Sequence, residues 1–254
     1  MKIFSVLIFL FTAFMPCVAQ ADTGFLWLVN KQNSLPESYA PSSLVDCKSV
    51  KLRQETADAF NIMQEAMTEE GMSALHLQSG YRNYGYQQAI LRQREKELMA
   101  KGHSKPEAAM LALKSVQPPG ASEHQLGLAL DVSINGKLEA AFGETPEGIW
   151  LAENCHKFGF IMRYPAHKTH ITGIVYEPWH LRYVGHPHAS IMKELDLTLE
   201  EYQNYLRQVG IYMFWGETEY WLVMYKTTPS EDGDVSSFNI SKNEFVTVYK
   251  KSAN

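Results

Sequence analysis

Hydrophobic residues follow helical spacing in some stretches of this chain and strand spacing in others, and glycine or proline ends most stretches. Between residues 50 and 70 apolar side chains recur at near-helical spacing until Gly71, whereas residues 74–80 alternate loosely, as in a strand. Short helices and strands in this mixture predict an α+β fold with a small antiparallel sheet flanked by helices. We expect helices over residues 50–70, 83–101, 104 to before 118, 145–158 and 198–209, and strands over residues 74–80, 126–134, 160–164 and 171–176.

Local signals place several boundaries between these segments. Pro106 falls in the first turn of the third expected helix, and Thr145 followed by Pro146 is typical of a helix N-terminus. The sequence Thr198-Leu199-Glu200-Glu201 is a capping box, in which the first and fourth residues bond each other's backbone. Asn135-Gly136 is the strongest two-residue hairpin signal in the chain, so we expect a hairpin turn there.

The composition changes after Gly210. Residues 211–225 are dominated by tyrosine, tryptophan, phenylalanine and valine, and residues 238–249 again resemble a strand. We therefore expect one α+β domain over residues 22–209 and a small β-rich C-terminal appendage over residues 210–254. The aromatic side chains of the appendage are compatible with an ordinary core: Tyr212, Phe214, Trp215, Tyr220 and Trp221.

The first 21 residues have the pattern of an export signal. Lys2 is their only charge, residues 3–15 are apolar, and Val18-Ala19-Gln20-Ala21 supplies an A-x-A cleavage pattern. The apolar run is shorter than the roughly 20 residues that span a bilayer comfortably. We expect cleavage after Ala21 and action in the periplasm, at the cell surface or outside the cell. A membrane anchor made by an uncleaved signal and a buried N-terminal helix are the alternatives.

The charge balance argues against some partners. The 254 residues include 23 Lys plus Arg and 28 Asp plus Glu, a net charge of −5, so the surface has no general attraction to nucleic acid or anionic lipid. With 45% hydrophobic and 20% charged residues, the composition is that of a globular protein. Removal of the signal leaves Cys47 and Cys155, which could form one disulfide or remain free thiols.

Two histidines and an aspartate have the chemistry of a catalytic zinc site. His124 and Asp131 stand seven residues apart, a gap that fits a loop entering a strand, with Gly127 allowing the backbone to turn closely. His180 would come from a distant segment. Catalytic zinc is typically held by three protein ligands, with a fourth position left for water. We therefore expect Zn²⁺ to be bound by His124, Asp131 and His180.

Glu177 and Arg82 could complete this site. Pro178 excludes an ordinary helix interior between Glu177 and His180, and on a regular strand residues three apart face opposite sides. Glu177 can therefore act as a general base beside the metal only if the chain bends at Pro178-Trp179. Arg82 would offer permanently charged donors to a developing oxyanion. Taken alone, each of these residues is more commonly a solvated charge, an ion-pair partner or a core hydrogen-bond partner.

Three short motifs follow one another along the chain. Residues 79–87 read S-G-Y-R-x-Y-x-x-Q, residues 122–131 read S-x-H-x-x-G-x-A-x-D, and residues 177–185 read E-P-W-H-x-R-Y-V-G. Together and in this order, the motifs resemble those of the zinc D-alanyl-D-alanine carboxypeptidase family typified by VanY. The departure is Asn83, where serine is usual, and we expect this change at a surface turn to be harmless. The resemblance implies zinc ligands His124, Asp131 and His180, a catalytic base Glu177, stabilisation of the carbonyl oxygen by Arg82, and a substrate groove lined by Ser122 and Gln87.

The same resemblance implies an exported zinc D,D-carboxypeptidase that hydrolyses the terminal D-Ala-D-Ala bond of peptidoglycan stem peptides. The alternatives are an L,D-carboxypeptidase that releases D-Ala from tetrapeptide stems, an endopeptidase, and a non-catalytic cell-wall or zinc-binding module. Glu177 favours an enzyme, because a binding module needs no base beside the metal. Arg163 and Ser122 are candidates for reading the terminal carboxylate. The sequence implies no protein partner and leaves the oligomeric state open.

Overall fold

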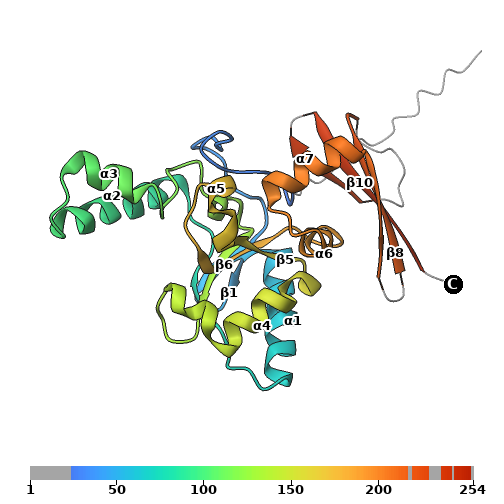
Figure 1. Cartoon of the computed structure of the whole chain (residues 1–254), viewed down its shortest axis with the longest axis horizontal. Helices are drawn as coiled ribbons and strands as arrows, with labels where there is room; N and C mark the ends of the chain where they lie inside the picture. Colours follow the sequence, from blue (N-terminus) through green and yellow to red (C-terminus); the bar gives the residue numbers. More distant parts are fainter. Residues whose placement is uncertain (1–23, 217–218, 229–235, 242, 253–254) are drawn as a thin grey trace, which may run out of the picture.

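Two four-stranded antiparallel sheets form the framework of the protein (Figure 1). This computed structural model describes residues 24–216, 219–228, 236–241 and 243–252. Each of the three sequence motifs includes part of a strand of the first sheet, and the predicted α+β fold with a small antiparallel sheet flanked by helices is confirmed. Its strands, in spatial order, are β3 (His76–Ser79), β4 (Ala129–Ser133), β6 (Glu177–Tyr183) and β5 (Phe160–Tyr164).

Two helices, α1 (Gln54–Glu69) and α4 (Pro146–Asn154), cover one face of this sheet (Figure 1). The buried side chains of α1 recur every three or four residues, which places them on one side of the helix. Burial of each large apolar side chain among them (Phe60, Met63 and Met67) stabilises the fold by about 1.5–3 kcal/mol. The cluster between helices and strands includes Phe60, Met63, Met67, Leu77, Leu130, Trp150, Leu151, Phe160 and Leu181.

The opposite face is covered by α6 (His188–Glu194), α7 (Leu199–Val209) and the extended segment of residues 24–29. The predicted capping box at the start of α7 is confirmed, since the Glu201 amide donates to the Thr198 hydroxyl and the Thr198 amide donates to the Glu201 carboxylate. This second apolar cluster includes Leu26, Leu126, Leu128, Ile161, Val184, Tyr202 and Leu206.

The second sheet packs on the outer side of α7 (Figure 1). Its strands lie in the order β7 (Ile211–Trp215), β8 (Glu219–Lys226), β10 (Glu244–Ser252) and β9 (Ser236–Ser241). Tyr212, Phe214 and Trp221 contact the same apolar cluster as α7, whereas Trp215 is 64% exposed. The expected β-rich C-terminal segment is therefore present, and its separation as an appendage at residue 210 stays a prediction.

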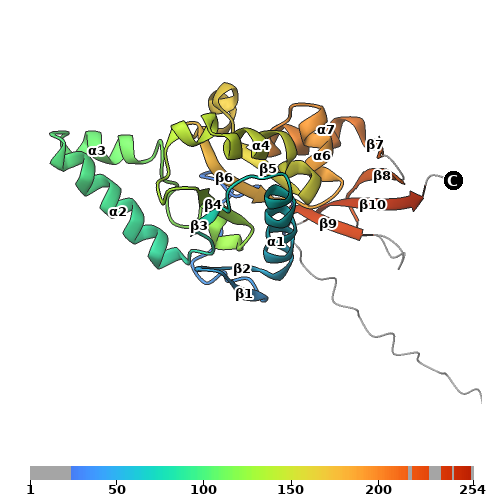
Figure 2. The same ribbon diagram turned by 90° about the horizontal axis from the view of Figure 1, so that it is seen from below.

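The helices α2 (Tyr84–Ala100) and α3 (Lys105–Ala112) project from the body as a separate arm (Figure 2). The Asn83 side chain caps α2 by accepting a hydrogen bond from the Tyr86 amide, so the asparagine fits this turn. The two helices bury Leu98, Ala108 and Ala112 between them. The predicted α2 is confirmed, whereas α3 ends at Ala112, before the expected stop at Pro118.

Three local predictions were wrong. Residues 50–53 are not the start of a helix, because β2 (Val50–Arg53) pairs with β1 (Leu44–Cys47) as a hairpin. Residues 171–176 are not a strand, because the short helix α5 (Thr169–Thr172) ends there at Gly173. Asn135-Gly136 does not join paired strands, because β4 already pairs with β3 and β6 on its two sides. Short 3₁₀ turns cover Glu123–Leu126, Ala140–Glu144, Cys155–Phe158 and Ala166–Lys168.

Cys47 and Cys155 are both free and buried, so the two thiols do not form a disulfide. The expected signal at residues 1–21 lies outside the described residues. Within the part of the chain that the structure describes, no helix is both long enough and apolar enough to cross a membrane.

Candidate metal centre

Asp131 and His180 lie side by side on the two central strands of the first sheet. They are direct partners in the register of β4 and β6, so both side chains point to the same face. The His180 Nδ1 atom is 3.0 Å from Asp131 Oδ1, and both residues are buried. Burial lowers the pKa of His180, but the carboxylates of Asp131, Glu123 and Glu177 outweigh burial and raise it to about 9. The position therefore favours positive charge.

His124 reaches the same point from the turn that precedes β4. The 3₁₀ turn Glu123–Leu126 ends at Gly127, whose backbone is left-handed with φ = 71°. A side chain at Gly127 would meet Leu44 and Arg53 at 3.0–3.1 Å, so the predicted close backbone turn is found. The carbonyl of Gly80 lies 2.7 Å from His124 Nδ1 and fixes the orientation of the ring.

The donor atoms of His124, Asp131 and His180 lie within 4.8 Å of one another, and the set fits a divalent metal ion. Because the Gly80 carbonyl can only accept, His124 Nδ1 donates to it and Nε2 carries a lone pair in the neutral ring. That Nε2 lies 3.3 Å from Asp131 Oδ2 and has no hydrogen-bond partner among the described residues. Burial and the charge of Arg82 lower the pKa of His124 to about 4. The ring is therefore neutral near pH 7, and no proton lies between its Nε2 atom and the Asp131 carboxylate.

Glu177 joins the site through a bulge in the sheet. Met162 pairs with Leu181 but Tyr164 pairs with Glu177. Between these two pairs the chain advances four positions along β6 and only two along β5. This irregularity is the bend that the Pro178 sequence required, and it brings Glu177 Oε2 within 3.8 Å of His180 Nδ1. Burial and the charge of Asp131 raise the pKa of Glu177 to about 7, against the lowering effect of His180 and Arg82.

Arg82 lies between β3 and α2, on the side of the site that faces Asp131 and Glu177. Its backbone amide donates to the His124 carbonyl at 3.2 Å, which fixes the turn. Burial lowers the pKa of Arg82, while the charges of Asp131 and Glu177 oppose that effect. The buried Nε atom has no hydrogen-bond partner among the described residues. A donor is therefore available at the metal site.

The two expected substrate residues, Ser122 and Gln87, are both buried. Ser122 is buried directly before the 3₁₀ turn that carries His124. Gln87, also buried, donates to the Gln117 carbonyl at 2.7 Å and leaves its own Oε1 unpartnered within the described chain. Their role in substrate binding stays a prediction.

The sequence profile of VanY D-alanyl-D-alanine carboxypeptidases matches residues 49–186. The chain belongs to this family. The Bacillus subtilis (strain 168) protein YodJ is 42% identical over 203 residues, which cover 75% of this chain and 71% of that protein.

Two solved structures resemble this member of the VanY family. The LdcB LD-carboxypeptidase, from a study of peptidoglycan recognition, has a TM-score of 0.63 and 42% identity over 72% of this chain and 86% of that chain. A mutant of the D,D-pentapeptidase VanY from a VanB-type vancomycin-resistance cassette, in complex with Zn(II), has a TM-score of 0.64. It is 38% identical over 70% of this chain and 98% of that chain.

The VanY-family site rests on an ion-pair network that the sequence analysis did not predict. Glu123, Arg163, Arg182 and Glu200 form one ion-pair network beneath the metal donors. Arg163 bonds Glu123 through Nε and Glu200 through both Nη atoms, so it is not free to read a substrate carboxylate as expected. A signal was present in the sequence, because an arginine inside a short apolar strand must find a buried partner.

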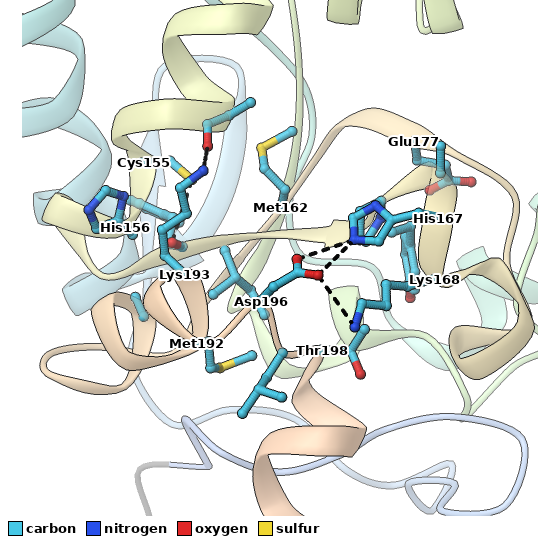
Figure 3. A pocket seen from close by; sticks show the side chains of 18 of the residues that line it. Cys155, His156, Met162, His167, Lys168, Glu177, Met192, Lys193, Asp196 and Thr198 are labelled. Atoms are coloured by element: carbon cyan, nitrogen blue, oxygen red, sulfur yellow. Dashed lines mark hydrogen bonds and ion pairs between the residues drawn. The ribbon is translucent and has the colours of Figure 1, made fainter.

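A cavity of about 380 Å³ opens beside Glu177 along the outer edge of β5 (Figure 3). Glu177 and His167 lie toward one side, Cys155 and His156 toward the other, and Met162 lies between them. Most of the wall is apolar, and Lys168, Lys193 and Asp196 add charge to the lining. Glu177 is part of the lining, whereas His124, Asp131, His180 and Arg82 are not.

Proposed function

We propose that this chain is a zinc-dependent D,D-carboxypeptidase that removes the terminal D-alanine from peptidoglycan stem peptides ending in D-Ala-D-Ala. The observation that carries the proposal is the Glu177 carboxylate, 3.8 Å from His180 in a site that also holds His124 and Asp131. The Zn(II) complex of a related D,D-pentapeptidase supports the choice of metal and bond. His124, Asp131 and His180 would hold the zinc ion.

Bound there, zinc would supply a Lewis acid that polarises a water molecule and the scissile carbonyl. Glu177 takes the proton of the attacking water and returns it to the nitrogen of the leaving D-alanine. Arg82 donates to the oxygen on which negative charge develops. Tyr164, packed 4.9 Å from the His180 ring, keeps that imidazole in place.

We propose that the cavity along β5, whose wall includes Glu177 but none of the three metal donors, takes part of the stem peptide. The apolar wall suits the alanine methyl groups, and Lys168 and Lys193 suit carboxylates elsewhere on the stem. The substrate places its action outside the cytoplasm. We therefore propose residues 1–21 as an export signal and residues 22–209 as the catalytic domain.

A second candidate is an L,D-carboxypeptidase that releases D-alanine from tetrapeptide stems. It is favoured by the likeness to the LdcB LD-carboxypeptidase, which matches this chain with 42% identity. Incubation of the zinc-loaded protein with defined pentapeptide and tetrapeptide stems separates the candidates by the masses of the products. Loss of one D-alanine from the pentapeptide alone supports the proposal, and loss from the tetrapeptide alone supports the alternative.

The Glu177→Gln variant tests the proposed base. Glutamine has nearly the same shape but cannot accept the proton, so we expect kcat to fall by about 10²–10⁴-fold. Zinc content, measured by atomic emission, should stay at the wild-type level because Glu177 is not a ligand. His180→Ala is the contrasting variant, expected to lose metal and activity together. Near-normal turnover in the glutamine variant would remove Glu177 from the mechanism.

A further inference from the structure

Glu123 is a buried carboxylate whose two oxygens have different surroundings. One oxygen, Oε1, lies 2.8 Å from Arg163 Nε and 3.0 Å from Arg182 Nη1. The other, Oε2, has no hydrogen-bond partner among the described residues. A buried acceptor of this kind is unfavourable when it stays unpaired. The free oxygen therefore needs a donor.

A candidate donor is the second ring nitrogen of His180, Nε2. His180 Nε2 is buried, lacks a hydrogen-bond partner in the described part of the chain, and lies 3.9 Å from Glu123 Oε2. The other nitrogen, Nδ1, faces Asp131 at 3.0 Å. One unpartnered donor and one unpartnered acceptor thus face each other, about 1 Å beyond the N–H···O distance of roughly 2.9 Å.

We propose that Glu123 is a positioning residue for the metal site and accepts a hydrogen bond from His180 Nε2 when Nδ1 binds the metal. This inference rests on the proposed metal function of His180. A ring that uses Nδ1 as a ligand carries its proton on Nε2, and a carboxylate there fixes that tautomer and the ring orientation. In His124 the two ring nitrogens have the opposite roles. Nδ1 contacts the Gly80 carbonyl, and Nε2 faces the site.

The buried arginines explain why a carboxylate can be held at this position. Arg163 and Arg182 carry two positive charges, and Glu123 and Glu200 carry two negative charges, so the network is balanced. Arg182 further donates through Nη2 to the carbonyls of Gly24, Phe25 and Trp27. Glu123 is thereby anchored by one oxygen and leaves the other directed at the imidazole.

A purely structural role for Glu123 is the competing explanation, and Glu200 provides the matched control. Both carboxylates pair with the same guanidinium, that of Arg163. Glu200 pairs with the Nη side of this guanidinium, and no contact between Glu200 and His180 occurs among the described residues. Glu123→Gln and Glu200→Gln therefore each remove one negative charge paired with the Arg163 guanidinium. Only Glu123→Gln removes the carboxylate that faces His180.

The test is zinc affinity measured by competition with a chromophoric chelator, with no substrate present. We expect Glu123→Gln to weaken zinc binding by about 10–100-fold and Glu200→Gln to change it by less than about threefold. The Co²⁺-substituted Glu123→Gln protein should also show a shifted visible absorption spectrum. Equal zinc affinity in folded Glu123→Gln and wild type would overturn the proposal, as would equal losses in both variants.

A measurement on the wild type covers the case in which Glu123→Gln does not fold. Long-range ¹H–¹⁵N spectra of the zinc-loaded protein report which nitrogen of each histidine carries the proton. We expect a protonated Nε2 in His180 and a protonated Nδ1 in His124. A His180 ring protonated on Nδ1 contradicts the proposal. Because neither experiment uses a substrate, failure here is separable from failure of the proposed carboxypeptidase activity.

Discussion

At the scale of single residues, the arginines near the metal site differ in what their donors contact. Arg163 and Arg182 direct theirs to buried carboxylates and backbone carbonyls. Arg82 instead has a buried Nε without a hydrogen-bond partner in the described chain, next to the charges of Asp131 and Glu177. Arg182 Nη1 also lacks a hydrogen-bond partner in the described chain but is paired with Glu123, so Arg82 is the better placed of the three to donate to a substrate.

The Arg82→Lys variant tests this assignment. Lysine keeps the charge but loses the planar set of donors, so the oxygen that becomes negative in the transition state is stabilised less. We expect kcat to fall by about 10²–10³-fold while KM changes less and zinc content stays constant. Arg92→Lys, on the exposed side of α2, is the control and should leave turnover unchanged. If both variants keep wild-type kcat, Arg82 does not contact the reacting oxygen.

The residues with distinctive chemistry could be predicted from the sequence, but their partners could not. His124, Asp131 and His180 converge as expected, because Asp131 and His180 belong to neighbouring strands and a glycine turn carries His124 inward. Arg163 was misjudged as a substrate ligand. Its buried pairing with Glu123 and Glu200 depends on strand order and on the bulge in β6, neither of which a motif encodes.

At the scale of elements, the turn between His124 and β4 fixes the position of His124 through backbone hydrogen bonds. Gly127 donates to the His124 carbonyl and accepts from the Arg53 amide, which ties the turn to the end of β2. Its left-handed backbone and its contacts with Leu44 and Arg53 leave little room for a side chain. A change there should be felt both in stability and at the metal.

Gly127→Ala and Gly173→Ala form a matched pair for this effect. Both glycines have φ = 71°, but a side chain at Gly173 would meet nothing within 4 Å. The backbone conformation alone costs an alanine about 1–2 kcal/mol. We expect Gly173→Ala to lower Tm by only that cost, and Gly127→Ala to lower Tm further and weaken zinc binding. Identical Tm and zinc affinity in the two variants would show that crowding at Gly127 is unimportant.

Elements with strong local signals were predictable, and those decided by pairing were not. The predicted caps at Thr145 and Thr198 begin helices as expected, since each cap satisfies backbone donors within its own turn. Residues 50–53 have helical spacing yet form a strand, because their partner strand precedes them. Asn135-Gly136 allows a hairpin, but β4 has both edges occupied by β3 and β6.

At the scale of the whole molecule, α7 connects the metal-bearing sheet to the C-terminal sheet. Its apolar side packs on the first sheet and on Val223 and Val246 of the second. On its polar side, Arg207 makes a two-fold ion pair with Glu244 of β10, at 2.8 and 2.9 Å. Glu244 also accepts hydrogen bonds from the hydroxyls of Tyr225 in β8 and Ser241 in β9. One carboxylate of β10 therefore connects three strands of the second sheet to α7.

The Glu244→Gln variant should reveal this connection as a pH-dependent loss of stability. Arg207, followed by Ser241 and Tyr225, lowers the pKa of Glu244 to about 2, below its ordinary value near 4.5. A carboxylate with a depressed pKa in the folded state stabilises the protein above about pH 4.5, and this contribution is lost as the pH falls toward 2. Because the pair is partly exposed to solvent, we expect about 1 kcal/mol at pH 7.

Thermal unfolding of both proteins from pH 7 down to pH 3, with a chelator present so that metal release does not contribute, measures the effect. For a chain of this size about 1 kcal/mol corresponds to a Tm difference of roughly 2–4 °C, and we expect that difference to narrow as the pH falls. Glu219→Gln is the control, since among the described residues Glu219 forms an ion pair only with an exposed lysine of its own sheet, Lys250. A Tm difference that widens toward acid would mean that Glu244 does not hold the C-terminal sheet to α7 through its charge.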